Sequence, residues 1–344
     1  MNEEEIKEKI LLKLKKHNLN NLQDQNEYGL NALMFCLKYN KTMNLGLDNE
    51  EWDYLINHSN LKQQDNLGYN AFMYALENNK SQNILLRKKQ FYNLLEKTDL
   101  KQNTKNNSNS LMYYFSNNKK ENLFFSEKKV DYLLKNSDLS FSNENTNILI
   151  YALNYFEAQN INLTTKQWDY LIRNSDIKQK MNDKTSLIYF IFFNNRKEIN
   201  MEENTLNYFI ENSDLYHQDQ SGWTAFLYAF RIIEKNPKNE SYIKKIYSCL
   251  NEEEKQETFY KICEKYIGIT KEFNQNHILF MLYDLQMKPK EEILEKLNKD
   301  ERYQDKLIKN QYQELLRMIE KRNVLWDLNK NLNQEKNKKD VLKI

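Results

Sequence analysis

One segment, polar at its start and apolar at its end, recurs along most of this chain at an almost constant spacing. Its clearest copy is LKQQDNLGYNAFMYAL, which starts at Leu61. The other copies start at Leu22, Leu100, Leu139, Ile177 and Leu215. Successive copies are therefore 39, 39, 39, 38 and 38 residues apart. A fixed period in this range is typical of stacked repeats, each of which buries its apolar face against its neighbours.

Each copy predicts a polar turn followed by a short helix. The clearest turns are residues 65–68 and 219–222, and each ends in a Gly that supplies a positive φ at no steric cost. An Asn or Thr then precedes the apolar segment, where its side-chain oxygen can accept from free N–H groups of the first helical turn. These predicted caps are Asn31, Asn70, Asn109, Asn147, Thr185 and Thr224.

A second helix is predicted after each of the first five copies, because apolar residues recur there at i, i+3 and i+4 and so share one face. The triplets are Trp52, Leu55 and Ile56; Phe91, Leu94 and Leu95; Val130, Leu133 and Leu134; Trp168, Leu171 and Ile172; Leu206, Phe209 and Ile210. Starts are predicted near Asp48, Ser126, Thr164 and Asn200. Polar pairs such as Asn136-Ser137 end these helices, and Asn there favours a left-handed C-cap.

The sequence predicts three regions. Residues 1–21 hold an N-terminal capping helix, with Ile6, Ile10 and Leu14 on one face. Residues 22–250 hold six repeats, and residues 251–344 hold C-terminal helices and a polar tail. Within the last region, residues 278–285 are interpreted as a degenerate seventh first helix, and residues 334–343 are expected to fray.

The pattern Asp-x-x-Gly-x-Asn/Thr-Ala-Phe/Leu, followed by a second helix and a polar stop, resembles the ankyrin repeat. Residues 65–72 and 219–226 carry the best matches, and the resemblance covers about two thirds of the chain. It implies an all-α solenoid of helix-turn-helix units. The period is longer than the family's, and three copies lack the turn Gly, so tight β-hairpins do not follow from residues 104–108, 142–146 and 181–184. Other helical-pair repeats (TPR, PPR and HEAT-like units) lack an Asp-x-x-Gly turn before the first helix.

The resemblance implies partner contacts at the turn tips and at the end of the first helix. Candidate tip residues here are Tyr28, Leu30, Leu67, Tyr69 and Trp223. Aromatic tips are diagnostic because the fold does not need them. The alternative for Tyr69 and Trp223 is packing against the neighbouring turn.

One position in the first helix, four residues after the cap, is aromatic in every copy. This ladder comprises Phe35, Tyr74, Tyr113, Tyr151, Tyr189 and Tyr228. One interpretation is a binding strip on the concave face, since Tyr offers a large contact area at low entropic cost. The other is packing between repeats, with the hydroxyl reaching a turn. Regular recurrence favours packing, and the two roles are compatible if the rings are half-buried.

The residues indicate no catalytic, metal or cofactor site. The four histidines, His17, His58, His217 and His277, show no metal-ligand spacing and are interpreted as surface residues. Asp53, Asp131 and Asp169 recur with the period, which indicates a solvated helix face rather than an acid–base pair. A net charge of +2 disfavours nucleic acid. No apolar run reaches the length of a membrane span.

The function predicted from the sequence is therefore a non-enzymatic scaffold that binds a partner protein along the concave face and turn tips of the solenoid. The alternative is a nucleic-acid-binding solenoid that stacks bases on the aromatic ladder. A cytoplasmic location is expected, because Cys36, Cys249 and Cys263 suggest no disulfide framework and the N-terminus shows no signal pattern. Export by a route that uses no cleaved N-terminal signal stays open, and the resemblance to ankyrin-repeat proteins is compatible with delivery into a host cell.

Overall fold

The computed structural model describes residues 2–123, 125–140, 142–143, 146–194, 199–232, 239–267, 273–299 and 306–341. The chain divides into two compact units, Met1–Ser213 and Asp214–Ile344, which we treat separately. The number of repeats and the region boundaries inferred from the sequence stay predictions.

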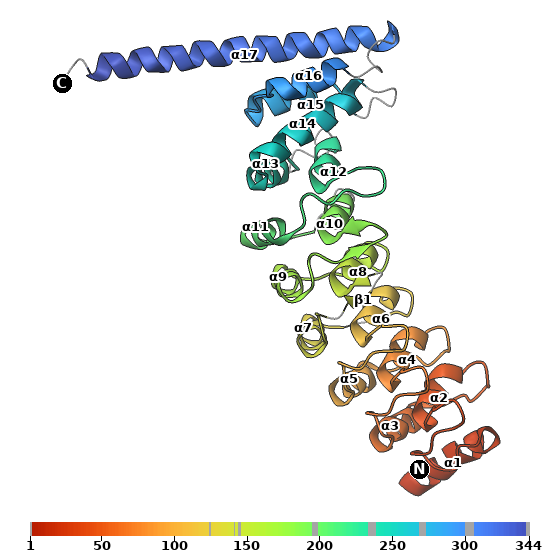
Figure 1. Ribbon diagram of the computed structural model, residues 1–344. Coiled ribbons are helices and arrows are strands. Elements are labelled where there is room, and N and C mark those ends of the chain that lie inside the picture. Colours follow the sequence, from red (N-terminus) through yellow and green to blue (C-terminus); the bar gives the residue numbers. More distant parts are fainter. Residues whose placement is uncertain are drawn as a thin grey trace. The chain divides into compact units, whose positions relative to one another are not determined.

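The first unit contains two rows of helices, stacked side by side (Figure 1). The A helices are α2 (Ala32–Tyr39), α4 (Ala71–Asn78), α6 (Ser110–Asn117), α8 (Ile148–Tyr155) and α10 (Ser186–Asn194). The B helices are α3 (Asn49–His58), α5 (Lys88–Lys97), α7 (Glu127–Asn136), α9 (Thr165–Asn174) and α11 (Glu203–Asn212). Each A helix and the following B helix occupy the predicted first and second positions of one copy of the recurring segment.

Local sequence explains why these helices start and pack where they do. All six predicted caps accept a hydrogen bond three residues on; Asn70 Oδ1, for example, accepts from the Met73 N–H at 2.9 Å. The Asn caps also reach forward, since the Asn70 amide donates to the Asp99 carbonyl at 3.3 Å. The predicted apolar triplets of the B helices are buried, with the exception of Leu206, which is half-buried.

Hairpin turns precede the A helices even where the turn Gly is missing. Strands β1 (Ser142–Asn143) and β2 (Thr146–Asn147) pair antiparallel, as do β3 (Lys180–Met181) and β4 (Lys184–Thr185). Asn182 and Asp183 take φ values of 46° and 62°, and Asn107 takes 54°, so these residues replace Gly at the left-handed positions. Residues 144–145, part of the 142–146 turn, lie outside the described residues.

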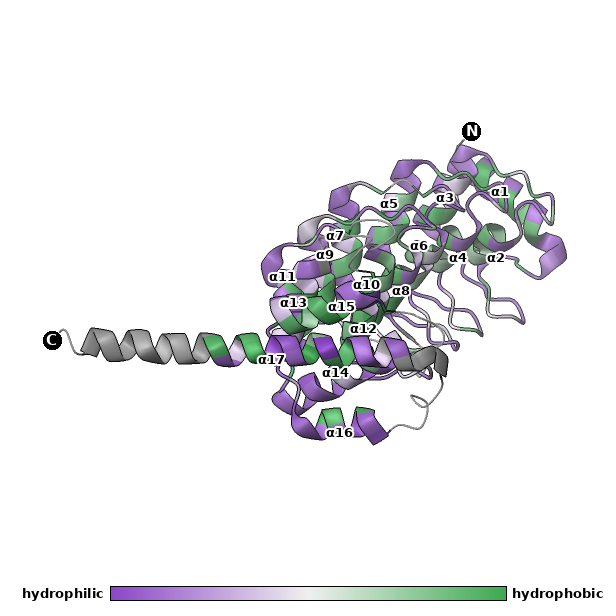
Figure 2. Ribbon diagram, turned by 90° about the horizontal axis from the view of Figure 1, so that it is seen from above, coloured by the Kyte–Doolittle hydropathy of each residue, from purple (hydrophilic) through white to green (hydrophobic). Residues whose placement is uncertain are grey.

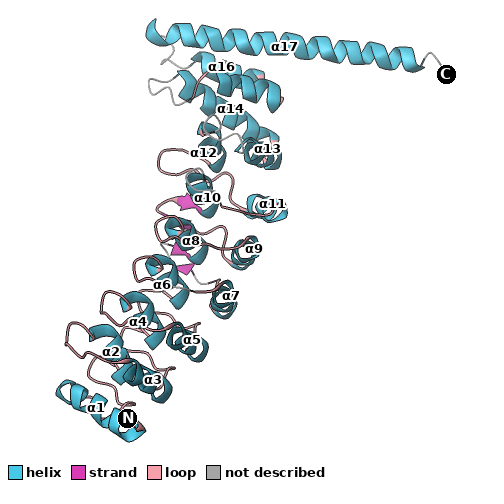
Figure 3. Cartoon of the chain, turned by 180° about the vertical axis from the view of Figure 1, so that it is seen from behind, coloured by secondary structure: helices cyan, strands magenta, loops and turns pink. Residues whose placement is uncertain are grey.

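The strands lie on the side of the A helices that faces away from the B helices, and helices dominate the chain (Figures 1 and 3). Paired helices with a hairpin turn before each A helix confirm the predicted all-α, ankyrin-like arrangement.

The ends of the B helices differ from the prediction. Their C-cap residues (Ser59, Thr98, Ser137, Ser175 and Ser213) are extended, with φ between −101° and −85°. The predicted left-handed Asn is instead the last helical residue. Asn136, for example, stays helical because its amide donates to the Tyr132 carbonyl four residues back, at 2.8 Å.

Left-handed asparagines occur in the loop between the A and B helices. Asn44, Asn83, Asn122 and Asn160 have φ values of 51°, 53°, 57° and 52°. They stand 39, 39 and 38 residues apart, so the turn is repeated with the period of the chain. Asn tolerates this conformation better than other residues with a side chain, and this explains how the chain builds its turns with only five Gly.

Polar side chains also join successive B helices. The Gln90 amide donates to Asp53 Oδ1 at 3.0 Å. Later pairs repeat this link, from Gln167 to Asp131 at 2.6 Å and from Thr205 to Asp169 at 2.6 Å. Between α5 and α7 both partners differ: Tyr92 stands at the position of the acid and Lys129 at the position of the donor. The Lys129 ammonium lies 4.8 Å from the centroid of the Tyr92 ring. The recurring carboxylates thus hold neighbouring helices together, in addition to facing solvent as predicted.

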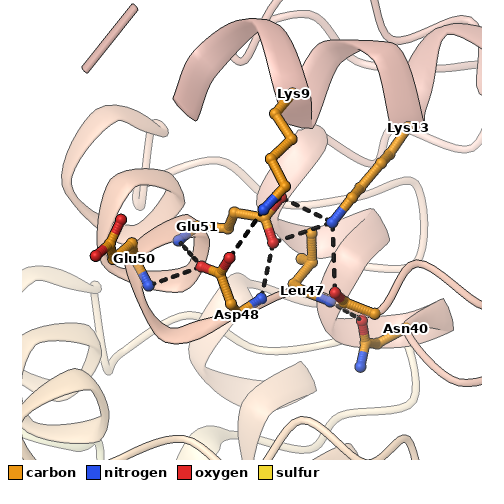
Figure 4. Close-up of polar contacts among 8 residues, drawn as sticks. Lys9, Lys13, Asn40, Leu47, Asp48, Glu50 and Glu51 are labelled. Carbon is orange, nitrogen blue, oxygen red and sulfur yellow. Dashed lines mark hydrogen bonds and ion pairs between the residues drawn. The ribbon is translucent and has the colours of Figure 1, made fainter. Parts of the chain in front are cut away.

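Helix α1 (Glu3–Leu14) packs against α3, the first B helix. Ile10 and Leu14 are fully buried and Ile6 nearly so. The Glu51 side chain of α3 is fully buried and accepts from Lys13 Nζ at 2.7 and 3.0 Å, with Lys9 Nζ at 3.4 Å (Figure 4). The Glu51 carboxylate also accepts from the Asp48 N–H at 2.7 Å, and this bond caps the start of α3.

The second unit contains α12 (Ala225–Arg231), α13 (Asn239–Cys249), α14 (Glu252–Ile267), α15 (Gln275–Leu279), the π-helix Phe280–Asp284, α16 (Glu291–Lys299) and α17 (Lys306–Val341). The helix expected from residue 278 begins earlier, because Asn274 Oδ1 accepts from the His277 N–H. His277 is 4% exposed and packs on Phe230 and Phe273, so its assignment to the surface was wrong.

Helix α17 continues to Val341 and includes most of the segment that was expected to fray; residues 342–344 lie outside the described residues. Hydrophobic and hydrophilic turns alternate along its described side chains (Figure 2). Leu315 and Ile319 are buried, whereas Val324 and Leu328 are more than half exposed. Within the described ranges, no helix combines the length and hydropathy needed to cross a bilayer.

Candidate protein-binding surface

The first two hairpin turns are each closed by one side chain. Asn26 Oδ1 accepts from the N–H groups of Tyr28 and Leu30, both at 3.0 Å. Asp65 Oδ1 accepts in the same way from Leu67 and Tyr69, at 2.9 and 2.8 Å. Because Asn26 and Asp65 close these two turns, the tip backbone is held by residues other than Tyr28 and Leu67.

Successive turns are tied to one another through their backbones. The Asn66 N–H donates to the Tyr28 carbonyl at 3.0 Å, and the Lys105 N–H donates to the Leu67 carbonyl at 2.8 Å. This contact requires Gly at residue 68, where φ is +85° and a Cβ would come within 2.8 Å of the Asn103 carbonyl oxygen. Tyr28 and Leu67 therefore occupy equivalent positions on adjacent tips.

The candidate tip residues differ in exposure. Tyr28 and Leu67 are 61% and 53% exposed, so both side chains are available to a partner. Leu30 is fully buried and Trp223 is 5% exposed. We correct the tip assignment for these two residues, since neither side chain presents a surface to contact. Tyr69 is half-buried, with its ring stacked on Tyr74 at 5.0 Å between centroids.

Trp223 is part of the core of the second unit. Its ring packs on Phe273 and Tyr228, with centroids 5.8 and 5.4 Å apart. The Lys265 ammonium lies 4.4 Å from the ring centroid, and the Arg231 guanidinium lies 5.3 Å away. The packing alternative considered for this tip aromatic is therefore the one that the structure supports.

The aromatic ladder joins the A helices to the turns. The buried Tyr74 donates its hydroxyl proton to Asp65 Oδ2 at 2.6 Å, and Tyr113 donates to the Tyr69 hydroxyl at 2.6 Å. Burial, followed by the hydrogen bond to Asp65, raises the pKa of Tyr74 far above its ordinary value. Burial likewise raises the pKa of Tyr113.

In two copies the ladder tyrosine donates to the Asp that stands nine residues earlier in the turn. In the second unit Tyr228 donates to Asp219 Oδ2 at 2.5 Å, which repeats the Tyr74–Asp65 contact. In the first copy the turn residue is Asn26 and the ladder residue is Phe35, which has no hydroxyl. Where the turn has Asn in place of Asp, the ladder residue nine positions later is therefore Phe in place of Tyr.

The remaining ladder residues pack in similar ways. Tyr189 is 9% exposed and donates to the Met181 carbonyl at 3.3 Å. Tyr151 is half-buried beside Tyr155, with ring centroids 4.8 Å apart, and burial raises its pKa to about 12. Phe35 is 5% exposed. These contacts support the packing interpretation for the buried rings, and a direct role of the ladder in binding stays a prediction.

The described residues include no group of three or more His, Cys, Asp or Glu arranged to hold a metal ion. The side chains that close the turns and cap the A helices, such as Asn26, Asp65 and Asn70, bond to backbone N–H groups and hold structure. The turn tips and the adjoining A helices present exposed apolar and charged side chains, which suits contact with another protein.

Comparison with known proteins adds little. No protein-family model matches the chain, and no curated protein matches it. Among solved structures the chain is similar to the ankyrin repeat domain of Bcl-3, a member of the IκB protein family. The two are 13% identical, with a TM-score of 0.38, over 66% of this chain and 89% of that one. The helix pairs and the hairpin turns before the A helices are what make the fold ankyrin-like.

Proposed function

We propose that this protein is a non-enzymatic scaffold, and that it binds a partner protein through the turn tips and adjoining A-helix faces of the unit Met1–Ser213. One observation carries the proposal: Tyr28 and Leu67, both mostly exposed, stand on adjacent tips that are fixed to each other by the Asn66–Tyr28 backbone hydrogen bond. Turn closure uses Asn26 and Asp65, so neither exposed side chain is needed for the turn.

The size of this face suits a protein partner. Neighbouring helices pack about 8–10 Å apart, so the four steps from α2 to α10 span roughly 32–40 Å. A typical interface of about 800 Å² per partner fits on such a surface. Large aromatic and aliphatic side chains held on a rigid base contribute most of the binding energy in interfaces of this kind.

Three statements about function rest on the sequence alone and stay predictions. They are the absence of catalysis, a cytoplasmic location and delivery into a host cell. The nucleic-acid alternative gains no support from the exposed tips, because Tyr28 and Leu67 bring no phosphate-binding charge. It is therefore treated as one outcome of the experiment.

The test is a crosslinking pull-down from lysate with the intact protein, a Tyr28→Ser/Leu67→Ser variant and a Leu12→Ser control. Leu12 is 75% exposed on α1 and provides the matched control, because it removes apolar surface away from the tips. We expect one protein to be captured by wild type and control and lost by the tip variant. Equal capture by all three proteins, or capture of nucleic acid in place of protein, contradicts the proposal.

A further inference from the structure

Beside the aromatic ladder, the A helices carry a row of side chains that change from one helix to the next. They lie three residues after each of the five ladder positions in the first unit, and residues i and i+3 share a helix face. We call Lys38, Glu77, Ser116, Asn154 and Phe192 the variable row. All are partly or largely exposed. Packing requires an aromatic at each ladder position but places no such requirement on the variable row, so partner choice can be encoded there.

The positive member of the row has no carboxylate partner. The Lys38 ammonium donates to the Tyr74 hydroxyl at 3.1 Å and lies 5.2 and 5.4 Å from the ring centroids of Tyr74 and Tyr39. It forms no ion pair with any described residue. The Tyr74 hydroxyl, which itself donates to Asp65, thus holds the Lys38 ammonium in place without neutralising its charge.

The negative member lies one helix further along the row. Glu77 is half-buried, and within the described part of the chain its carboxylate makes no hydrogen bond or ion pair. Burial raises its pKa, and the more distant Lys120 and Lys38 offset this only in part. An incompletely solvated carboxylate without a partner is costly, so a cation brought by a binding partner gains free energy there.

Phe192 ends the row on the described part of α10. It is 43% exposed and meets Phe193 edge-on, with ring centroids 5.3 Å apart. The order along the row is therefore cation, anion, hydroxyl, amide and aromatic ring. A ligand that crosses the A helices one after another would contact these five side chains in this order.

We propose that the variable row binds an extended peptide segment with complementary order: an acidic residue at Lys38, a basic residue at Glu77 and an apolar residue at Phe192. An extended chain advances about 3.3 Å per residue and neighbouring helices lie about 8–10 Å apart, so roughly three peptide residues correspond to one helix. The basic residue therefore follows the acidic one by about three positions and precedes the apolar one by about nine. This inference rests on the proposed scaffold function and specifies its partner.

The experiment is selection from a displayed library of random peptides of about 16 residues, long enough to cross from α2 to α10. The targets are wild type, a Lys38→Glu/Glu77→Lys variant and a control with Lys89→Glu/Glu50→Lys, whose exposed charges lie on the B helices. All three proteins have the same net charge. Thermal melts followed by circular dichroism check that the variants remain folded.

We expect wild type and the control to enrich an acid three residues from a base, with an apolar residue beyond the base. The row variant should enrich the reverse order of charges. A selected peptide should show about a tenfold preference between wild type and the row variant by fluorescence anisotropy, because like charges then face each other.

The same charge order from all targets, or no enrichment, overturns this inference. If the pull-down partner is still lost on Tyr28→Ser/Leu67→Ser but captured normally by the row variant, the scaffold proposal stands and only the variable row is removed from it.

Discussion

At the scale of single residues, one hydrogen bond explains a pattern that the sequence shows twice. Asp65 closes its turn with one carboxylate oxygen and receives the Tyr74 hydroxyl on the other. Where Asn26 stands in the turn, its amide nitrogen replaces the second oxygen, and the ladder residue is Phe35. A hydroxyl there would have no carboxylate to bond. We therefore expect the two residues to act as one unit.

Tyr74→Phe should lower the free energy of unfolding by about 1–3 kcal/mol, because the largely buried Asp65 carboxylate loses a donor. The double change Asp65→Asn/Tyr74→Phe copies the Asn26/Phe35 pair and should recover most of this loss. Urea unfolding of both single variants and the double variant measures the coupling. If the single losses simply add in the double variant, the pair is not a unit.

At the scale of elements, asparagine takes the left-handed backbone positions that glycine usually occupies. Its left-handed positions in the A–B loops recur at Asn44, Asn83, Asn122 and Asn160. The loop contains further links, since Asn40 donates its amide to the Gln82 and Asn83 carbonyls at 3.3 and 3.2 Å. These loops therefore set the spacing of neighbouring repeats as well as the path from A helix to B helix.

Asn83→Ala should destabilise the protein by about 1–2 kcal/mol, because a left-handed conformation is strained for residues with an ordinary Cβ. Asn83→Gly should cost less, since Gly takes positive φ freely and loses only backbone entropy. Asn78→Ala, in the last turn of α4, is the control and should have little effect. Urea midpoints of the three variants test the order; equal losses for Ala and Gly would contradict it.

At the scale of the whole molecule, the first repeat of the stack needs a polar surface that covers its apolar side. Helix α1 provides it by covering α3 and by bringing Lys9 and Lys13 to the fully buried Glu51 (Figure 4). Later B helices hold Gln90 and Gln167 at this position, where the partner is the preceding repeat. Among the B helices an acid occurs at this position only in α3, where the lysines of α1 neutralise it; α7 has Lys129 there.

Deletion of residues 1–18 should lower stability by about 3–5 kcal/mol or more, because Glu51 becomes an unpaired charge beside newly exposed apolar surface. Glu51→Gln in the truncated chain should recover part of the loss, whereas the same change in the full chain should destabilise it. Thermal and urea unfolding of the four proteins measure this. Gln no better than Glu in the truncated chain would contradict the pairing.

The tyrosine ladder predicts loss of structure at high pH. Burial raises the pKa of Tyr151 from 10 to about 12, and those of Tyr74 and Tyr113 also rise. A pKa raised in the folded state contributes stability that is present below the unfolded pKa and is lost as pH rises through the folded one. Stability should therefore fall from about pH 10 to about pH 12.

Tyrosinate absorbance and circular dichroism, recorded together, should show ladder ionisation coupled to loss of helix. Tyr151→Phe should shift this alkaline transition to higher pH. Ionisation of every tyrosine near pH 10 with the helices intact would show that the ladder is not buried in solution.

Prediction from the sequence succeeded where a residue acts on its own neighbourhood. The caps Asn31 to Thr224 and the B-helix triplets were found because capping and helical periodicity are local properties. It failed for Leu30 and Trp223, which look like tip residues but turn inward, and for His277, because burial depends on elements far away in the chain. Two contacts leave a trace in the sequence, because both partners change together in another repeat. Gln90 and Asp53 are replaced by Lys129 and Tyr92, and Asp65 and Tyr74 are replaced by Asn26 and Phe35.

The sequence by itself determined the period, the caps of the A helices and the order of charges along the A helices, since each is set by residue type and spacing. Only the tertiary structure decided which side chains face water. Exposure of Tyr28, Leu67 and Phe192, and burial of Glu51 and Trp223, depend on the distance between neighbouring elements and on what covers each face. Those quantities arise from packing over the whole unit, and no local pattern contains them.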